Sequence, residues 1–118
     1  ACEAMGAEPF AVDDAYRSLK SGKIERNETT DTLADGLKTV LGQHTFPVIQ
    51  QYVKTIIRVE ESEIVRAMRL VWERMKIIIE PSSAVAVAAV LREPAAFAGK
   101  RAGILVSGGN VDLGNLPF

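Results

Sequence analysis

The stretch Ile104-Leu105-Val106-Ser107-Gly108-Gly109-Asn110 leads from three apolar residues directly into a pair of glycines. A short, continuous apolar run before glycines predicts a strand in a sheet that is covered on both faces. The carboxyl end of a parallel strand is where open α/β folds bind ligands, and glycines there let the backbone approach a ligand closely. The alternative is a plain turn after the strand, since adjacent glycines are common in turns.

Two helices are predicted upstream of this stretch. Over residues 61–78, apolar side chains recur every three or four positions, which is typical of an amphipathic helix. Residues 82–92 predict a second helix, and its run Ala84–Leu91 is apolar on every face, so we expect it to be buried on all sides. Glu80 stands between an isoleucine run and this helix, where its carboxylate could cap the helix or line a site.

The first half of the chain adds shorter elements. We predict the end of a strand over residues 1–8, a helix over 15–20 ended by Gly22, a polar loop over 21–35, a turn or short helix over 36–41, a helix from Pro47 with apolar positions up to Ile56, and a strand over 56–59. Helices that alternate with short buried strands indicate an α/β fold.

The composition argues against several classes of partner and site. The net charge of -1 and the pI near 5.9 give no electrostatic reason to expect nucleic acid or an anionic membrane as a partner. A single cysteine excludes an intrachain disulfide and suits the reducing cytoplasm, where we expect the protein to be located. With only one histidine besides, the chain offers no zinc site.

The chain itself is expected to be an excerpt. It opens on Ala1-Cys2-Glu3 without an initiator Met, and two or three short strands cannot satisfy their own edges. We therefore expect residues 1–118 to be an incomplete part of a longer polypeptide.

Five motifs in order resemble one enzyme family. They are Glu8-Pro9 with Asp13-Asp14, Thr32–Lys38, Leu70-Val71-Trp72-Glu73-Arg74-Met75-Lys76, Glu80-Pro81 before the Ala/Val-rich helix, and Ser107–Leu113. Together they resemble the C-terminal third of the serine racemase and serine-threonine dehydratase family, enzymes of pyridoxal phosphate (PLP) fold type II. The resemblance implies a partial three-layer α/β/α fold, with residues 1–118 as the C-terminal segment of the PLP-binding large domain.

The resemblance also implies roles for individual residues. Ser107 matches the hydroxyl that hydrogen-bonds the pyridine nitrogen of PLP, with Gly108, Gly36 and Glu80 on the cofactor side and Thr39 on the substrate side. A hydroxyl, unlike a carboxylate, does not keep that nitrogen protonated, so the ring is a weaker electron sink. No catalytic residue is expected in this segment, because the family's Schiff-base lysine lies upstream.

A metal site is implied near the start of the chain. Glu8 and Asp14 match two carboxylates that bind a divalent cation in the family, with the carbonyl of Val12 between them. Oxygen ligands of this kind suit Mg²⁺ or Ca²⁺. The alternative is that Asp13 or Asp14 simply caps the helix that follows.

The family implies a function for the parent protein. It would dehydrate and deaminate small hydroxy amino acids such as L-serine, L-threonine or 3-hydroxyaspartate, or racemise serine, as a homodimer. This chain alone is expected to be inactive. The competing hypothesis is a non-catalytic binding or oligomerisation module derived from that fold, and another enzyme of the same fold, such as a synthase, is a third.

Overall fold

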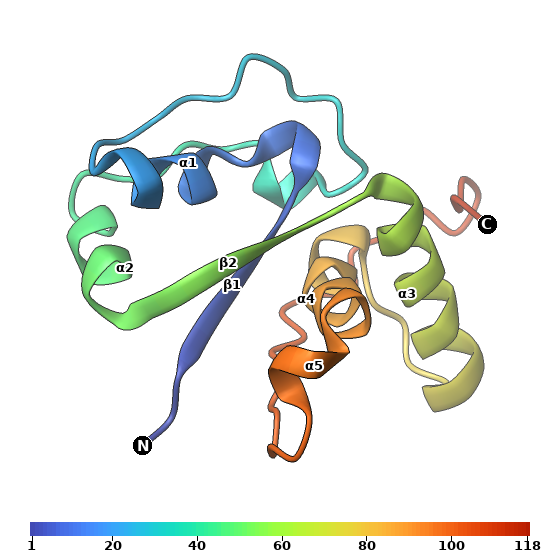
Figure 1. The fold of residues 1–118 in the computed structure, drawn as a ribbon. Helices are drawn as coiled ribbons and strands as arrows, with labels where there is room; N and C mark the ends of the chain where they lie inside the picture. The colour runs from blue at the N-terminus through green and yellow to red at the C-terminus, as the bar shows by residue number, and fades with distance from the viewer.

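The computed structural model describes all of residues 1–118 and places two strands between layers of helices. In chain order the elements are β1 (Ala4–Pro9), a 3-10 turn (Phe10–Val12), α1 (Asp14–Ser21), a second 3-10 turn η2 (Asp35–Leu37), α2 (Phe46–Tyr52), β2 (Val53–Val59), α3 (Glu61–Met75), α4 (Pro81–Arg92) and α5 (Pro94–Phe97). The strands pair in parallel, with Gly6 opposite Ile56. In Figure 1, α1 and α2 lie on one side of this sheet and α3, α4 and α5 on the other. The predicted α/β fold with a parallel sheet is confirmed.

Successive residues of β2 face opposite layers. Ile57 and Val59 pack against the core that α3 and α4 form. Arg58, between them, lies over the ring of Tyr16 in α1 at 3.9 Å and pairs with Asp13 at 3.1 Å. This alternation is the period of a strand, and it means that β2 carries side chains into both layers.

The border between α2 and β2 differs from the sequence prediction. The apolar positions after Pro47 predicted a helix that continues to Ile56, but α2 ends at Tyr52 and β2 begins at Val53. Residues 53–59 are rich in β-branched side chains and pair with β1, which favours the strand over another turn of helix.

The helix α3 begins as predicted and ends three residues early. A capping box of Glu60 and Glu63 satisfies the first turn, and Lys76 ends the helix because it adopts a left-handed conformation with φ of 59°. The expected extension to Ile78 is wrong, and Ile78 is 53% exposed. The chain leaves the helix axis there and turns Ile79 into the core instead.

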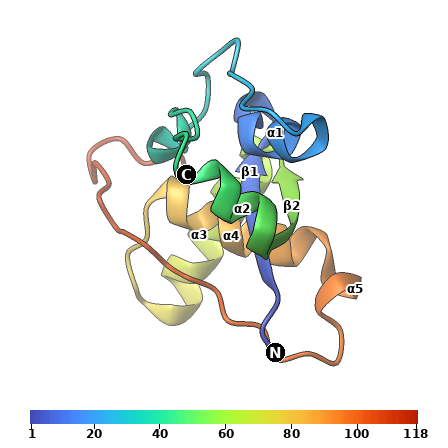
Figure 2. The same cartoon turned by 90° about the vertical axis from the view of Figure 1, so that its left-hand side faces the viewer.

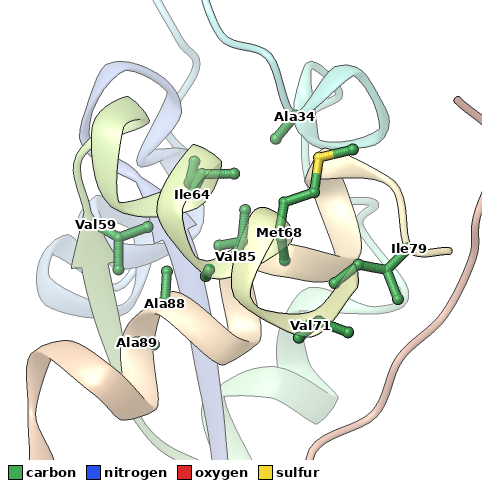
Figure 3. Close-up of a cluster of buried hydrophobic side chains, with 11 residues drawn as sticks. Ala34, Val59, Ile64, Met68, Val71, Ile79, Val85, Ala88 and Ala89 are labelled. Atoms are coloured by element: carbon green, nitrogen blue, oxygen red, sulfur yellow. The ribbon is translucent and has the colours of Figure 1, made fainter. Parts of the chain in front are cut away.

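The core lies mainly between α3 and α4. Its buried residues are Ala34, Val59, Ile64, Ala67, Met68, Val71, Ile79, Ala84, Val85, Ala88 and Ala89. Figure 3 shows most of these side chains gathered between the two helices, with the side chain of Met68 directed toward Ala34. The predicted stripe of α3 is confirmed at these positions. The expectation that Ala84–Leu91 is buried on all sides is wrong, because Leu91 is exposed.

The C-terminal segment forms no strand in this structure. Residues 98–112 are neither helix nor strand, and Leu105 is 84% exposed. The strand predicted over Ile104-Leu105-Val106 is therefore wrong here. A strand requires ladder hydrogen bonds from a neighbour, and β1 and β2 pair only with each other. None of the helices is both long and apolar enough to span a membrane.

Candidate functional site

The first turn of α4 and the Ser107–Asn110 segment lie against each other. Glu80 N donates to the Gly108 carbonyl at 3.1 Å, and Asn110 N donates to Glu80 Oε2 at 2.9 Å. In Figure 2 this part of the C-terminal segment, drawn in red, runs past the loop between α3 and α4. The side chain of Glu80 therefore anchors the glycine segment, and the alternative that it caps α4 is wrong, because it makes no cap hydrogen bond.

Both glycines of this segment are in close contact with the chain that precedes α4. A Cβ at Gly108 would lie 2.7 Å from Glu80 Oε1, and a Cβ at Gly109 would lie 2.7 Å from the carbonyl oxygen of Ile78. The sequence interpretation gave these glycines a role in admitting a ligand. In the structure the absence of a side chain at these glycines lets their segment pack closely against Ile78 and Glu80.

Ser83 is the residue that the sequence interpretation missed. Its side chain is 1% exposed, and its hydroxyl accepts from Gly108 N at 2.8 Å, donates to the Gly108 carbonyl at 2.9 Å and lies 3.3 Å from the Ser107 hydroxyl. A signal was available, since a serine beside an otherwise apolar helix must find hydrogen-bond partners if it is buried. Ser83 thus joins α4 to the residue predicted to contact PLP.

Gly36 is brought to the same end of α4 by η2. Its N–H donates to Ser82 Oγ at 3.0 Å and to Asp35 Oδ1 at 2.9 Å. The loop before it is held by Glu61, which accepts from the Thr32 hydroxyl at 2.5 Å. Gly36, Glu80, Ser107 and Gly108 therefore meet around the start of α4, although they are up to 72 residues apart in the sequence.

Thr39 is not part of this cluster. It lies two residues after η2, is exposed, and makes no side-chain hydrogen bond. A hollow of about 450 Å³ is also elsewhere: Phe10, Tyr16, Arg58 and Arg92 are among the residues that line it. The start of α4 is thus a surface of assembled polar groups rather than the wall of that hollow.

Glu8, Val12 and Asp14 form a separate group at the end of β1. Glu8 accepts from Ala15 N at 3.1 Å and from Tyr16 N at 2.8 Å, so Glu8 satisfies the start of α1. Asp13 makes no cap hydrogen bond. The first turn of α1 is therefore capped by Glu8, a residue of β1 that the sequence prediction had assigned to a metal site.

The two buried acids of this group, Glu8 and Asp14, have different surroundings. Burial is the main cause that raises the pKa of Glu8 to about 7, and the neighbouring charges of Asp14 and Asp13 act in the same direction, against the lowering effect of the two N–H donors. Asp14 is also buried, and its carboxylate accepts from Asn27 Nδ2 at 3.0 Å. No group of three or more acidic, histidine or cysteine side chains could hold a metal ion. A cation here would depend on backbone carbonyls and water to complete its ligands.

The polar groups at the start of α4 fit the nitrogen edge of a PLP ring. Ser107 is an exposed residue whose hydroxyl can donate or accept a hydrogen bond, and Gly108 adds no side chain beside it. No lysine takes part in the hydrogen bonds of this cluster. The arrangement can therefore orient a ring but offers no amine for a covalent bond to it.

Comparison with known proteins identifies the family to which the chain is similar. Residues 1–108 match the family model described as pyridoxal-phosphate dependent enzyme. The chain is 47% identical over 114 residues to a beta-hydroxyaspartate dehydratase of Paracoccus denitrificans, covering 97% of this chain and 36% of that relative.

Solved structures agree with this match. The serine racemase of Dictyostelium discoideum superposes with a TM-score of 0.87 at 51% identity, over 94% of this chain and 36% of that one. A threonine deaminase from T.th. superposes with a TM-score of 0.88 at 43% identity, over 93% of this chain and 37% of that one. The chain thus spans little more than a third of the relatives that it matches. It belongs to the family of pyridoxal-phosphate-dependent enzymes.

Proposed function

We propose that residues 1–118 are the C-terminal segment of the PLP-binding large domain of a longer enzyme. Three observations support this: the chain spans about 36% of its relatives, β1 and β2 have no further neighbours, and apolar side chains such as Leu105 are exposed. In a longer polypeptide these strand edges and side chains would be covered. Below, the full-length polypeptide means the product of the complete reading frame.

We further propose that the full-length polypeptide dehydrates and deaminates small hydroxy amino acids, with serine racemisation as the alternative fate of the same substrates. PLP, when bound, supplies an electron sink for the electrons left at the α-carbon as its proton departs. Ser107 would hydrogen-bond the ring nitrogen, and Gly108, Gly36 and Glu80 would shape the cofactor side. Thr39 would lie toward the substrate.

The observation that carries this proposal is the exposed Ser107 hydroxyl beside Gly108, held in place from α4. A neutral hydroxyl cannot hold a proton on the ring nitrogen as a carboxylate would, so the ring withdraws electrons less strongly. A weak sink favours loss of the β-hydroxyl over a long-lived carbanion. This matches relatives described as a beta-hydroxyaspartate dehydratase, a threonine deaminase and serine racemases.

Substituting Ser107 in the full-length polypeptide tests the proposal. We expect Ser107→Ala to lower keto-acid release from L-serine, L-threonine or L-threo-3-hydroxyaspartate by about tenfold or more, since a hydrogen bond to a charged or desolvated group is lost. Ser107→Asp should protonate the ring nitrogen and raise the ratio of D-serine to keto acid. Ser62→Ala is the matched control, since Ser62 is exposed in α3 and its side chain makes no hydrogen bond.

Two outcomes would contradict the proposal. Unchanged keto-acid release in Ser107→Ala would remove Ser107 from the cofactor site. A full-length polypeptide that neither acquires PLP absorbance nor releases keto acid from any of the three substrates would instead favour a non-catalytic binding or oligomerisation module.

We propose in addition that Glu8, Asp14 and the carbonyl of Val12 hold Mg²⁺ or Ca²⁺. The support is the burial of two neighbouring carboxylates at the end of β1, where a divalent cation would offset their repulsion. The full-length polypeptide should then gain about 2.7 kcal/mol of stability at a cation concentration of 100 Kd. Thermal melts with and without Ca²⁺ measure this.

A matched pair of variants separates binding from capping. Asp14→Asn should abolish the cation-dependent rise in melting temperature, whereas Asp31→Asn, in the exposed loop, should keep it. If no cation raises the melting temperature of the unsubstituted protein, Glu8 serves only as the cap of α1.

We propose that the full-length polypeptide is a cytoplasmic homodimer. Cys2 is exposed and unpaired, which suits a reducing compartment. Sedimentation of the full-length polypeptide decides between monomer and dimer.

A further inference from the structure

The hydroxyl of Ser83 is buried and makes its hydrogen bonds to the segment that carries Ser107. It is the one buried polar side chain of α4, and all three of its hydrogen-bond contacts are to residues 107 and 108. A buried hydroxyl beside a predicted cofactor contact restricts how that contact can donate or accept.

A count of protons and lone pairs limits this network to two arrangements of hydrogen bonds. A serine hydroxyl has one proton and two lone pairs. Gly108 N can only donate, so Ser83 always gives it one lone pair; in a first arrangement Ser83 gives its own proton to the Gly108 carbonyl. In this first arrangement one lone pair of Ser83 is left, so Ser107 donates to Ser83 across their 3.3 Å contact.

The network has a second arrangement that also leaves every one of these polar groups with a partner. The Gly108 carbonyl also accepts from Glu80 N at 3.1 Å, so it stays satisfied if Ser83 turns its proton away. Ser83 can then donate to Ser107, which frees the Ser107 proton to point outward. In the first arrangement Ser107 presents a lone pair to a ligand, and in the second it presents a proton that the bond from Ser83 polarises.

We propose that Ser83 is a positioning residue for Ser107, and that the two hydroxyls form a relay that matches Ser107 to the ring nitrogen of PLP in either of its protonation states. This inference rests on the proposed function, in which Ser107 faces that nitrogen. Ser83 touches neither cofactor nor substrate, and it acts only through the Ser107 hydroxyl and the Gly108 backbone.

A double-mutant cycle in the full-length polypeptide tests the relay. The readouts are the Kd for PLP and the ¹⁵N chemical shift of the ring nitrogen in apoprotein reconstituted with ¹⁵N-labelled PLP. Ser83→Ala should weaken PLP binding by about two- to tenfold, the worth of one net hydrogen bond, and should move the ¹⁵N shift. In the Ser107→Ala background the same change should leave the ¹⁵N shift unmoved, while the Kd keeps only the part of the effect that passes through the Gly108 backbone.

Further variants test whether any effect of Ser83→Ala comes from loss of folding. Ser83→Cys keeps a side chain of similar shape with a weak donor and a weak acceptor, so it should fold and give an intermediate ¹⁵N shift. Ser62→Ala should leave both readouts unchanged. Circular dichroism of each apoprotein confirms that the variants compared are folded.

The outcomes are distinguishable. A change in the ¹⁵N shift by Ser83→Ala that is equally large with and without the Ser107 hydroxyl would overturn the relay and leave Ser83 with a structural role. A change in Ser107→Ala without any change in Ser83→Ala or Ser83→Cys would also overturn it, and would leave the proposed function intact. If Ser107→Ala moves neither readout, the proposed function fails and the relay fails with it.

Discussion

Gly109→Ala is expected to disrupt the candidate PLP site more than any other small substitution in this chain. The new Cβ would lie 2.7 Å from the carbonyl oxygen of Ile78, and the obstacle is backbone rather than a movable side chain. One of the two chain segments must shift, and overpacking of this kind costs about 1–3 kcal/mol. The shift would displace Ser107 and Gly108 from Ser83.

The measurement is the Kd for PLP of the full-length polypeptide together with its unfolding midpoint. We expect PLP binding to weaken by about tenfold or more, because both hydrogen bonds between Ser83 and Gly108 depend on the position of the segment. Gly103→Ala is the matched control: its Cβ would meet nothing within 4 Å, and its φ is not in the left-handed region. Equal effects of the two substitutions would show that the contact with Ile78 does not matter.

Met68→Ala is expected to give the largest loss of stability. Met68 belongs to α3 and is fully buried in the core that includes Ala34, so its truncation leaves a cavity there (Figure 3). Truncations of this kind cost about 2–5 kcal/mol, from the lost burial and from the cavity that remains. A urea titration of the full-length apoprotein measures the free energy of unfolding.

Met75→Ala is the control on the same helix. Met75 is 64% exposed at the end of α3, so the same chemical change removes little burial there. We expect its effect to stay within about 0.5 kcal/mol, as for most surface substitutions. A loss as large as that of Met68→Ala would mean that Met75 is covered in the full-length polypeptide.

The helices were largely predictable, because their signals are local. The stripe through Ile64, Met68 and Val71 and the glycine stop at Gly22 are both properties of neighbouring residues, and both appear in the structure. Lys76 was not predictable as a helix end, since any residue other than glycine is uncommon in the left-handed conformation. The end of α3 depends on Ile79 reaching the core, which the local pattern does not contain.

The strands were less predictable, because a strand exists only through its neighbour. Residues 53–55 carry helix-compatible spacing and become a strand by pairing with β1. Ile104-Leu105-Val106 carries a strand pattern and stays unpaired. The same apolar run can therefore be a strand or an extended segment according to what lies beside it.

Some residues of the candidate site were also predictable from the sequence, and others were not. Ser107, Gly108, Gly36 and Glu80 could be nominated from motifs in the sequence. For Ser83 the sequence signalled only that a buried serine needs partners, because the partners themselves are 24 and 25 positions away. The start of α1 shows the same limit. Sequence proximity favoured Asp13 or Asp14 as the cap, and the structure assigns it to Glu8.

The order of the motifs along the chain determined the family, the α/β class and the cofactor, since each depends on which residue types occur and in what succession. The tertiary structure alone decided which hydroxyl supports Ser107, which carboxylate caps α1, and why Gly109 must lack a side chain. The physical reason is range: helix periodicity and capping act within one or two turns, whereas hydrogen bonds and steric contacts at the site join segments that only folding brings together.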